Sequence, residues 1–118
     1  EIGTAVFACV DSIDVRRLIW EAVKDKVTFF CDARMSAEVL RVLSACDSRS
    51  RRYYPTTLFR TEEAFAGPCT AKTTIYCANI AAGLMVSQFT KHLRQLPIEP
   101  DLQLNLLASE LSVADACL

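Results

Sequence analysis

The first strand-to-helix transition constrains the fold more than any other part of this sequence. An apolar run, residues 4–10, is followed by Asp11, and a helical pattern begins near Ile13. In α/β folds a carboxylate at such a junction lies in the ligand crevice, just outside the carboxyl end of a strand. The segment therefore predicts a strand, a helix and an acidic residue placed where folds of this class bind ligands.

A second apolar run follows and completes a strand–helix–strand unit. The spacing predicts a helix over 13–26 and a buried strand over 27–31, which is rich in β-branched and aromatic residues. Such a unit implies a parallel strand pair and a right-handed crossover. Either Asp11 or Ser12 can cap the helix, because a side-chain oxygen there accepts an unpaired backbone N–H.

The rest of the chain predicts a mixture of elements. They are a strand over 38–45 (with a helix left open), a polar loop over 47–57, a short helix over 61–66, a long helix over 70–96, and a closing hairpin or β-arm over 102–113. The long helix has no charged residue from Thr73 to Thr90, the bare length of a membrane span. Polar residues interrupt it and cationic residues flank it, so we expect a helix packed on the sheet and no membrane partner.

Length and charge indicate one domain, residues 1–118, with no electrostatic partner. Thirteen basic residues against fourteen acidic ones give a net charge of −1, which does not favour nucleic acid. The local cluster Arg49, Arg51 and Arg52 is too small for a several-phosphate contact and predicts a solvated loop. The six cysteines contain no Cys-x-x-Cys pair, so zinc is not predicted. The α/β pattern, with no secretory signal in the sequence, predicts a reduced, cytoplasmic protein.

Several short motifs occur in a recognisable order. They are Val10-Asp11-Ser12-x-x-x-Arg16, Val27-Thr28-Phe29-Phe30-Cys31, Ala33-Arg34-Met35, Gly67-Pro68-Cys69-Thr70 and Ala81-Ala82-Gly83-Leu84-Met85. Over roughly residues 5–95 this order resembles the C-terminal half of ThiF/MoeB/HesA-type proteins, the E1-like (ubiquitin-activating-type) adenylating enzymes. The resemblance implies a partial Rossmann-like α/β fold with a mixed, partly parallel sheet, one long core helix and a C-terminal β-arm.

The resemblance also implies a chemistry. Such enzymes bind Mg-ATP and adenylate the C-terminal carboxylate of a ubiquitin-like protein or peptide. Asp11 matches the family's aspartate at the metal and triphosphate, and Mg²⁺ does favour carboxylate and phosphate oxygens. Arg16 would orient Asp11 or stabilise its helix. Asp32 and Arg34, expected just past the second strand, would line the cofactor crevice or fasten a loop.

Cys69 is the one cysteine with a chemical role implied by the resemblance, as a nucleophile for thioester or persulfide transfer. It lies before a predicted helix, and the start of a helix favours a thiolate. No histidine is near it in sequence, so the same position also fits a cysteine without a catalytic role.

The sequence departs from the family in its first half. The glycine-rich loop and the ribose-binding acid are missing, so we expect a C-terminal fragment that lacks the nucleotide-binding half and is inactive alone. The alternative is a non-catalytic E1-like scaffold or dimerisation module. Without the missing half of the parallel sheet, the strand over 4–10 is expected to be an exposed sheet edge, and such edges tend to pair with another chain. A homodimer is therefore expected.

Overall fold

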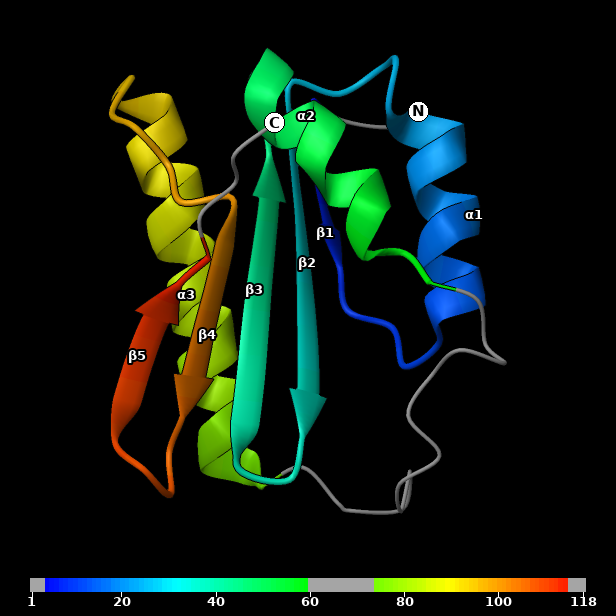
Figure 1. Ribbon diagram of the computed structural model, residues 1–118. Coiled ribbons are helices and arrows are strands. Elements are labelled where there is room, and N and C mark those ends of the chain that lie inside the picture. The colour runs from blue at the N-terminus through cyan, green and yellow to red at the C-terminus, as the bar shows by residue number, and fades with distance from the viewer. Residues whose placement is uncertain (1–3, 60–73, 115–118) are drawn as a thin grey trace.

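The computed structural model describes residues 4–59 and 74–114. Its elements are β1 (Ala5–Ala8), α1 (Ile13–Val23), β2 (Phe29–Ser36), β3 (Val39–Ala45), α2 (Ser48–Tyr53), the 3-10 helix η1 (Tyr54–Thr57), α3 (Ile75–Leu93), β4 (Asp101–Asn105) and β5 (Glu110–Val113). The five strands form one mixed sheet with helices on both faces (Figure 1), so the expected α/β class is confirmed.

The strand order in the sheet is β1-β2-β3-β4-β5. β1 and β2 are parallel, as the strand–helix–strand pattern predicted, and the other three pairs are antiparallel. β1 therefore lies at one edge of the described sheet, as expected for residues 4–10. The strand expected over 38–45 and the hairpin expected over 102–113 are both present.

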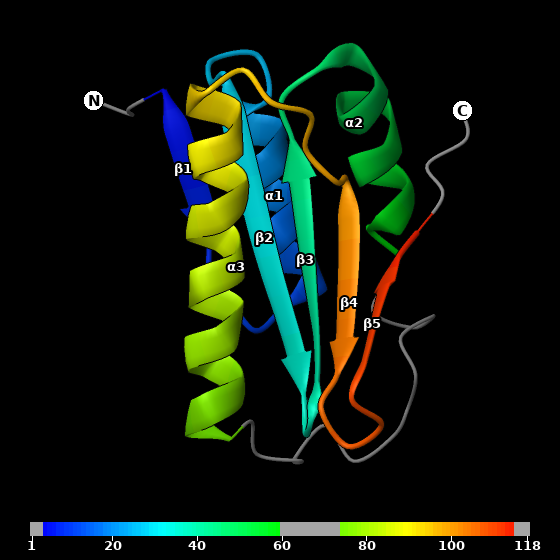
Figure 2. The same cartoon turned by 90° about the vertical axis from the view of Figure 1, so that its left-hand side faces the viewer.

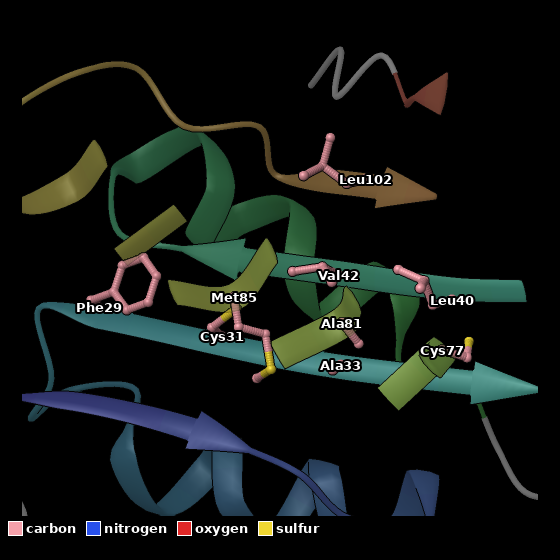
Figure 3. Packing of buried hydrophobic residues seen from close by; sticks show 9 residues of the cluster. All are labelled: Phe29, Cys31, Ala33, Leu40, Val42, Cys77, Ala81, Met85 and Leu102. Atoms are coloured by element: carbon pink, nitrogen blue, oxygen red, sulfur yellow. The ribbon is translucent and has the colours of Figure 1, made fainter. Parts of the chain in front are cut away.

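Alternate residues of the central strands face opposite sides of the sheet. On one side α3 packs against β2 and β3 (Figure 2), through buried side chains such as Cys31, Val42 and Met85 (Figure 3). On the other side α1 and η1 enclose a second core that includes Trp20 and Phe30. Burying a large apolar side chain contributes about 1.5–3 kcal/mol, so these two cores stabilise both layers.

Two expectations about local structure were wrong. β2 continues past Cys31 to Ser36, so Asp32 and Arg34 lie within the strand and not beyond it. The extension is stable because β3 pairs with all of residues 30–36. The predicted loop over 47–57 is instead α2 followed by η1, because Asp47 and Ser50 form a capping box that begins a helix.

The remaining expectations concern the long helix and its neighbourhood. α3 is present within the predicted range 70–96 and packs on the sheet. Among the described residues, no helix has the length and apolar character needed to cross a membrane. The short helix expected over 61–66 and the candidate nucleophile Cys69 lie outside the described residues.

Candidate functional site

A crevice of about 770 Å³ lies at the carboxyl end of the parallel strand pair. Its walls are residues 9–11 after β1, residues 33–35 of β2, the first turns of α1, and one side of α3. Small-molecule sites usually have volumes of about 300–1,000 Å³, and ligands of open α/β sheets bind outside the carboxyl ends of the strands. Both its size and its place make this crevice the candidate site.

Asp11 is an exposed residue in the lining of the crevice. The cap of α1 is Ser12, whose side chain accepts a hydrogen bond from the backbone N–H of Val15 at 3.4 Å. Of the two caps that the sequence allowed, the structure therefore uses Ser12. Asp11 is not required to begin the helix, and it lines the crevice as an exposed acidic residue.

Arg16 is buried at the inner wall of the crevice, with 6% of its surface exposed. Its Nε donates to Asp32 Oδ1 at 2.8 Å. Its Nη2 donates to the carbonyl of Val10 at 2.5 Å and to the carbonyl of Ala33 at 3.2 Å. One guanidinium thus joins the segment after β1 to β2.

Asp32 is fully buried and does not line the crevice. Besides Arg16, it accepts hydrogen bonds at Oδ2 from Arg34 Nε at 3.0 Å and from the Tyr54 hydroxyl at 2.9 Å. Burial, and then the nearby charge of Asp32, raise the pKa of Tyr54, so its hydroxyl keeps the proton that it donates. Asp32 therefore anchors the side chains of Arg16, Arg34 and Tyr54.

Arg34 combines the two roles that the sequence left open. It lines the crevice, and it also fastens η1 through hydrogen bonds to the carbonyl and the side-chain hydroxyl of Thr57, both at 2.9 Å. Its guanidinium carbon lies 5.9 Å from the centre of the Tyr54 ring. Sequence reasoning missed Tyr54 and Thr57 because their segment was predicted to be a loop.

The crevice also has an apolar side and an exposed thiol. Ala78, Ala81 and Ala82 of α3 contribute small side chains to the wall of the crevice. Cys9, next to Val10, also lines the crevice and is exposed. Cys31 differs, because burial raises the pKa of its thiol to about 12. In residues 4–59 and 74–114, no three or more His, Cys, Asp or Glu side chains gather as a metal-binding group.

Three of the four predicted cofactor-binding residues are brought together. Asp11, Arg16 and Arg34 line the same crevice, and Asp32 holds the two arginines from within the fold. A carboxylate and two guanidinium groups beside an apolar wall can bind a ligand with both cationic and anionic parts. No protein-family model and no curated protein sequence matches this chain.

Proposed function

We propose that this chain contributes the metal-binding side of an ATP-dependent adenylating site of the ThiF/MoeB/HesA type. Such a site activates the C-terminal carboxylate of a ubiquitin-like protein or peptide. The observation that carries the proposal is the position of Asp11, an exposed carboxylate in a crevice at the carboxyl end of a parallel strand pair.

The residues in the crevice fit Mg-ATP in their chemistry. Asp11 would hold the Mg²⁺, since this ion commonly takes one or two carboxylates together with phosphate oxygens. Arg16 and Arg34 supply positive charge beside it, and the alanines of α3 leave room for an apolar part of the ligand. When bound, Mg-ATP would supply the adenylyl group: an oxygen of the acceptor carboxylate would bond to the α-phosphorus, the bond to the β-phosphate would break, and pyrophosphate would leave.

The proposal requires a phosphate-binding loop from outside this sequence. The three glycines, Gly3, Gly67 and Gly83, are isolated from one another, so the chain has no glycine-rich turn. In this proposal the 118 residues are one part of the site and do not adenylate a substrate alone. We further propose a cytoplasmic location, where free thiols such as Cys9 stay reduced.

A non-catalytic dimerisation module is the second candidate, and the outer surface of α3 favours it. Ile75, Val86 and Leu93 are 79%, 58% and 64% exposed on this helix, and β1 is an edge strand. An exposed apolar helix face, together with a strand at the edge of the described sheet, favours self-association. Light scattering at micromolar concentration measures it, and a monomer would contradict this candidate.

Calorimetry with Mg-ATP on the longest natural form of the protein tests the adenylation proposal. We expect Asp11→Asn to weaken Mg-ATP binding about tenfold or more, which is about 1.4 kcal/mol. Binding of metal-free ATP should stay unchanged or become slightly tighter, because the lost carboxylate repels the triphosphate. The matched control is Asp25→Asn, which removes an exposed carboxylate after the other end of α1.

The outcomes separate the two candidates. A Mg²⁺-dependent loss in Asp11→Asn, with Asp25→Asn within twofold of the unchanged protein, supports the adenylation site. If a form that includes a glycine-rich loop binds no Mg-ATP, the adenylation proposal is wrong and the dimerisation module becomes the better candidate.

A further inference from the structure

The backbone that carries Asp11 is fixed by a side chain and not by the sheet. The paired residues of β1 end at Ala8, so residues 9–11 lie beyond the strand ladder. The Val10 carbonyl, one peptide before Asp11, accepts the 2.5 Å hydrogen bond from Arg16 Nη2. The same nitrogen also contacts the carbonyl of Ala33 in β2. Arg16 therefore extends the connection between the parallel strands past the point where their ladder stops.

We infer that Arg16 is a positioning residue for Asp11. By holding the Val10 carbonyl, it fixes the peptide from which the Asp11 side chain enters the crevice. This inference rests on the proposed function, because it concerns the direction of the carboxylate toward Mg²⁺. Groups that orient a metal ligand typically change metal affinity 10- to 100-fold when they are removed.

The shape of the guanidinium explains why an arginine occupies this position. Its planar group reaches one carboxylate and two backbone carbonyls, on Asp32, Val10 and Ala33. Lysine is a point charge on a flexible stem and does not reproduce this rigid arrangement. Asp32 is itself held by Arg34 and Tyr54, so the guanidinium is fixed from behind.

The test compares the same substitution at two neighbouring positions of α1. Arg16→Lys keeps the charge but loses the planar contacts. Arg17→Lys is the matched control, since Arg17 holds the carbonyls of Leu58 and Phe59 and does not line the crevice. We expect Arg16→Lys to reduce Mg-ATP affinity about tenfold while metal-free ATP affinity stays within twofold, and Arg17→Lys to change neither.

A double-mutant cycle separates positioning from a general structural role. If Arg16 acts through Asp11, Arg16→Lys has no further effect on Mg-ATP affinity in an Asp11→Asn background. If its role is structural, the losses add and metal-free ATP binding falls as well. Circular dichroism and thermal unfolding check that each variant is folded. Tyr54→Phe, which removes one hydrogen bond from the Asp32 carboxylate that holds Arg16, replaces Arg16→Lys if that variant does not fold.

The failure of this inference is distinguishable from the failure of the proposed function. If the unchanged protein binds Mg-ATP, Asp11→Asn loses this binding and Arg16→Lys behaves like Arg17→Lys, only the positioning role is overturned. If Asp11→Asn has no effect on Mg-ATP binding, the proposed function is overturned and the positioning role with it.

Discussion

Two buried aspartates of this protein are held by the same types of side chain, arginine and tyrosine, in different surroundings. Asp32 and Asp101 both lie on the face of the sheet opposite α3, and each accepts hydrogen bonds from arginine and tyrosine. The two tyrosines are consecutive in the sequence: the hydroxyl of Tyr54 donates to Asp32 at 2.9 Å, and that of Tyr53 donates to Asp101 at 2.6 Å. One short segment, at the junction of α2 and η1, thus serves both carboxylates.

The difference between them is what their arginines touch. The partners of Asp32, which are Arg16 and Arg34, line the crevice. Asp101 instead forms a two-point pair with Arg41 of β3, at 2.9 and 2.6 Å, and Arg41 is not part of the crevice. The same chemistry therefore supports a candidate site in one place and joins β3 to β4 in the other. Only the first network should couple stability to ligand binding.

The largest expected effect is the loss of the Asp32 carboxylate. Asp32→Ala leaves the charge of Arg16 buried without its ion-pair partner, which should cost about 3–5 kcal/mol in the free energy of unfolding. Asp101→Ala should cost less, because the side chain of Arg41 is 30% exposed and water can solvate it. Urea denaturation of both variants measures the difference. Equal losses would contradict the distinction between the two networks.

The Asp101 network should also make stability depend on pH. Burial opposes its charged form, but hydrogen bonds from Arg41 and Tyr53 hold the pKa of Asp101 below its usual value. A carboxyl group with a lowered pKa in the folded state stabilises the fold above about pH 4, its unfolded value, and this contribution is lost as the pH falls through the folded pKa. Asp101→Asn should therefore cost about 1–3 kcal/mol at pH 7 and progressively less below about pH 4.

Urea midpoints measured from neutral to acidic pH test this dependence. Asp25→Asn is the control, because it removes an exposed carboxylate that is not part of the hydrogen-bond network of Asp101. Asp47 and Glu99, whose pKa values are also lowered by hydrogen bonds, remain in both proteins and contribute equally. If the difference in stability between Asp101→Asn and the unchanged protein is constant with pH, Asp101 is not the source of the pH dependence.

Local patterns were sufficient to predict the two parallel strands. The apolar runs over 4–10 and 27–31 predicted them, because a short apolar run between polar segments is a strand signal that needs no distant partner. The expected full burial of the first strand was wrong, since Ala8 is the one buried residue of β1. The same reasoning placed Asp32 and Arg34 past the second strand, at the edge that holds Asp11. Asp11 and Arg34 do line one crevice, but Arg34 lies within β2 and Asp32 is buried. The expectation of an edge strand over 4–10 came from the missing first half of the resembled fold, and β1 does lie at one edge of the described sheet.

The charged half of β2 could not be predicted from its own residues. Asp32 is stable inside the fold because Arg16 and Tyr54, which are 16 and 22 positions away in the sequence, hold it together with the nearby Arg34. No local pattern contains that information, so the strand was ended too early. The helix α2 is different, since Asp47 and Ser50 are a local capping signal, whereas the loop was predicted from the polar composition and from Pro55 alone.

The smallest expected effects come from the two tyrosine hydroxyls, and they give the finest test of the comparison. Tyr54→Phe should cost about 1–2 kcal/mol and Tyr53→Phe about 0.5–1 kcal/mol, because Tyr54 is 1% exposed and Tyr53 is only half-buried. Phenylalanine keeps the ring of Tyr54 against Trp20, 4.9 Å between centres, so packing changes little. Each variant therefore isolates one hydrogen bond to one aspartate.

Calorimetry on the same two variants connects this stability difference to the site. Tyr54→Phe loosens Asp32 and, through it, Arg16, so we expect Mg-ATP affinity to fall about twofold to threefold. Tyr53→Phe acts on Asp101, whose arginine is outside the crevice, and should leave the affinity unchanged. An equal effect of both variants on binding would mean that the two aspartate networks act as one, and that the crevice depends on the whole face of the sheet.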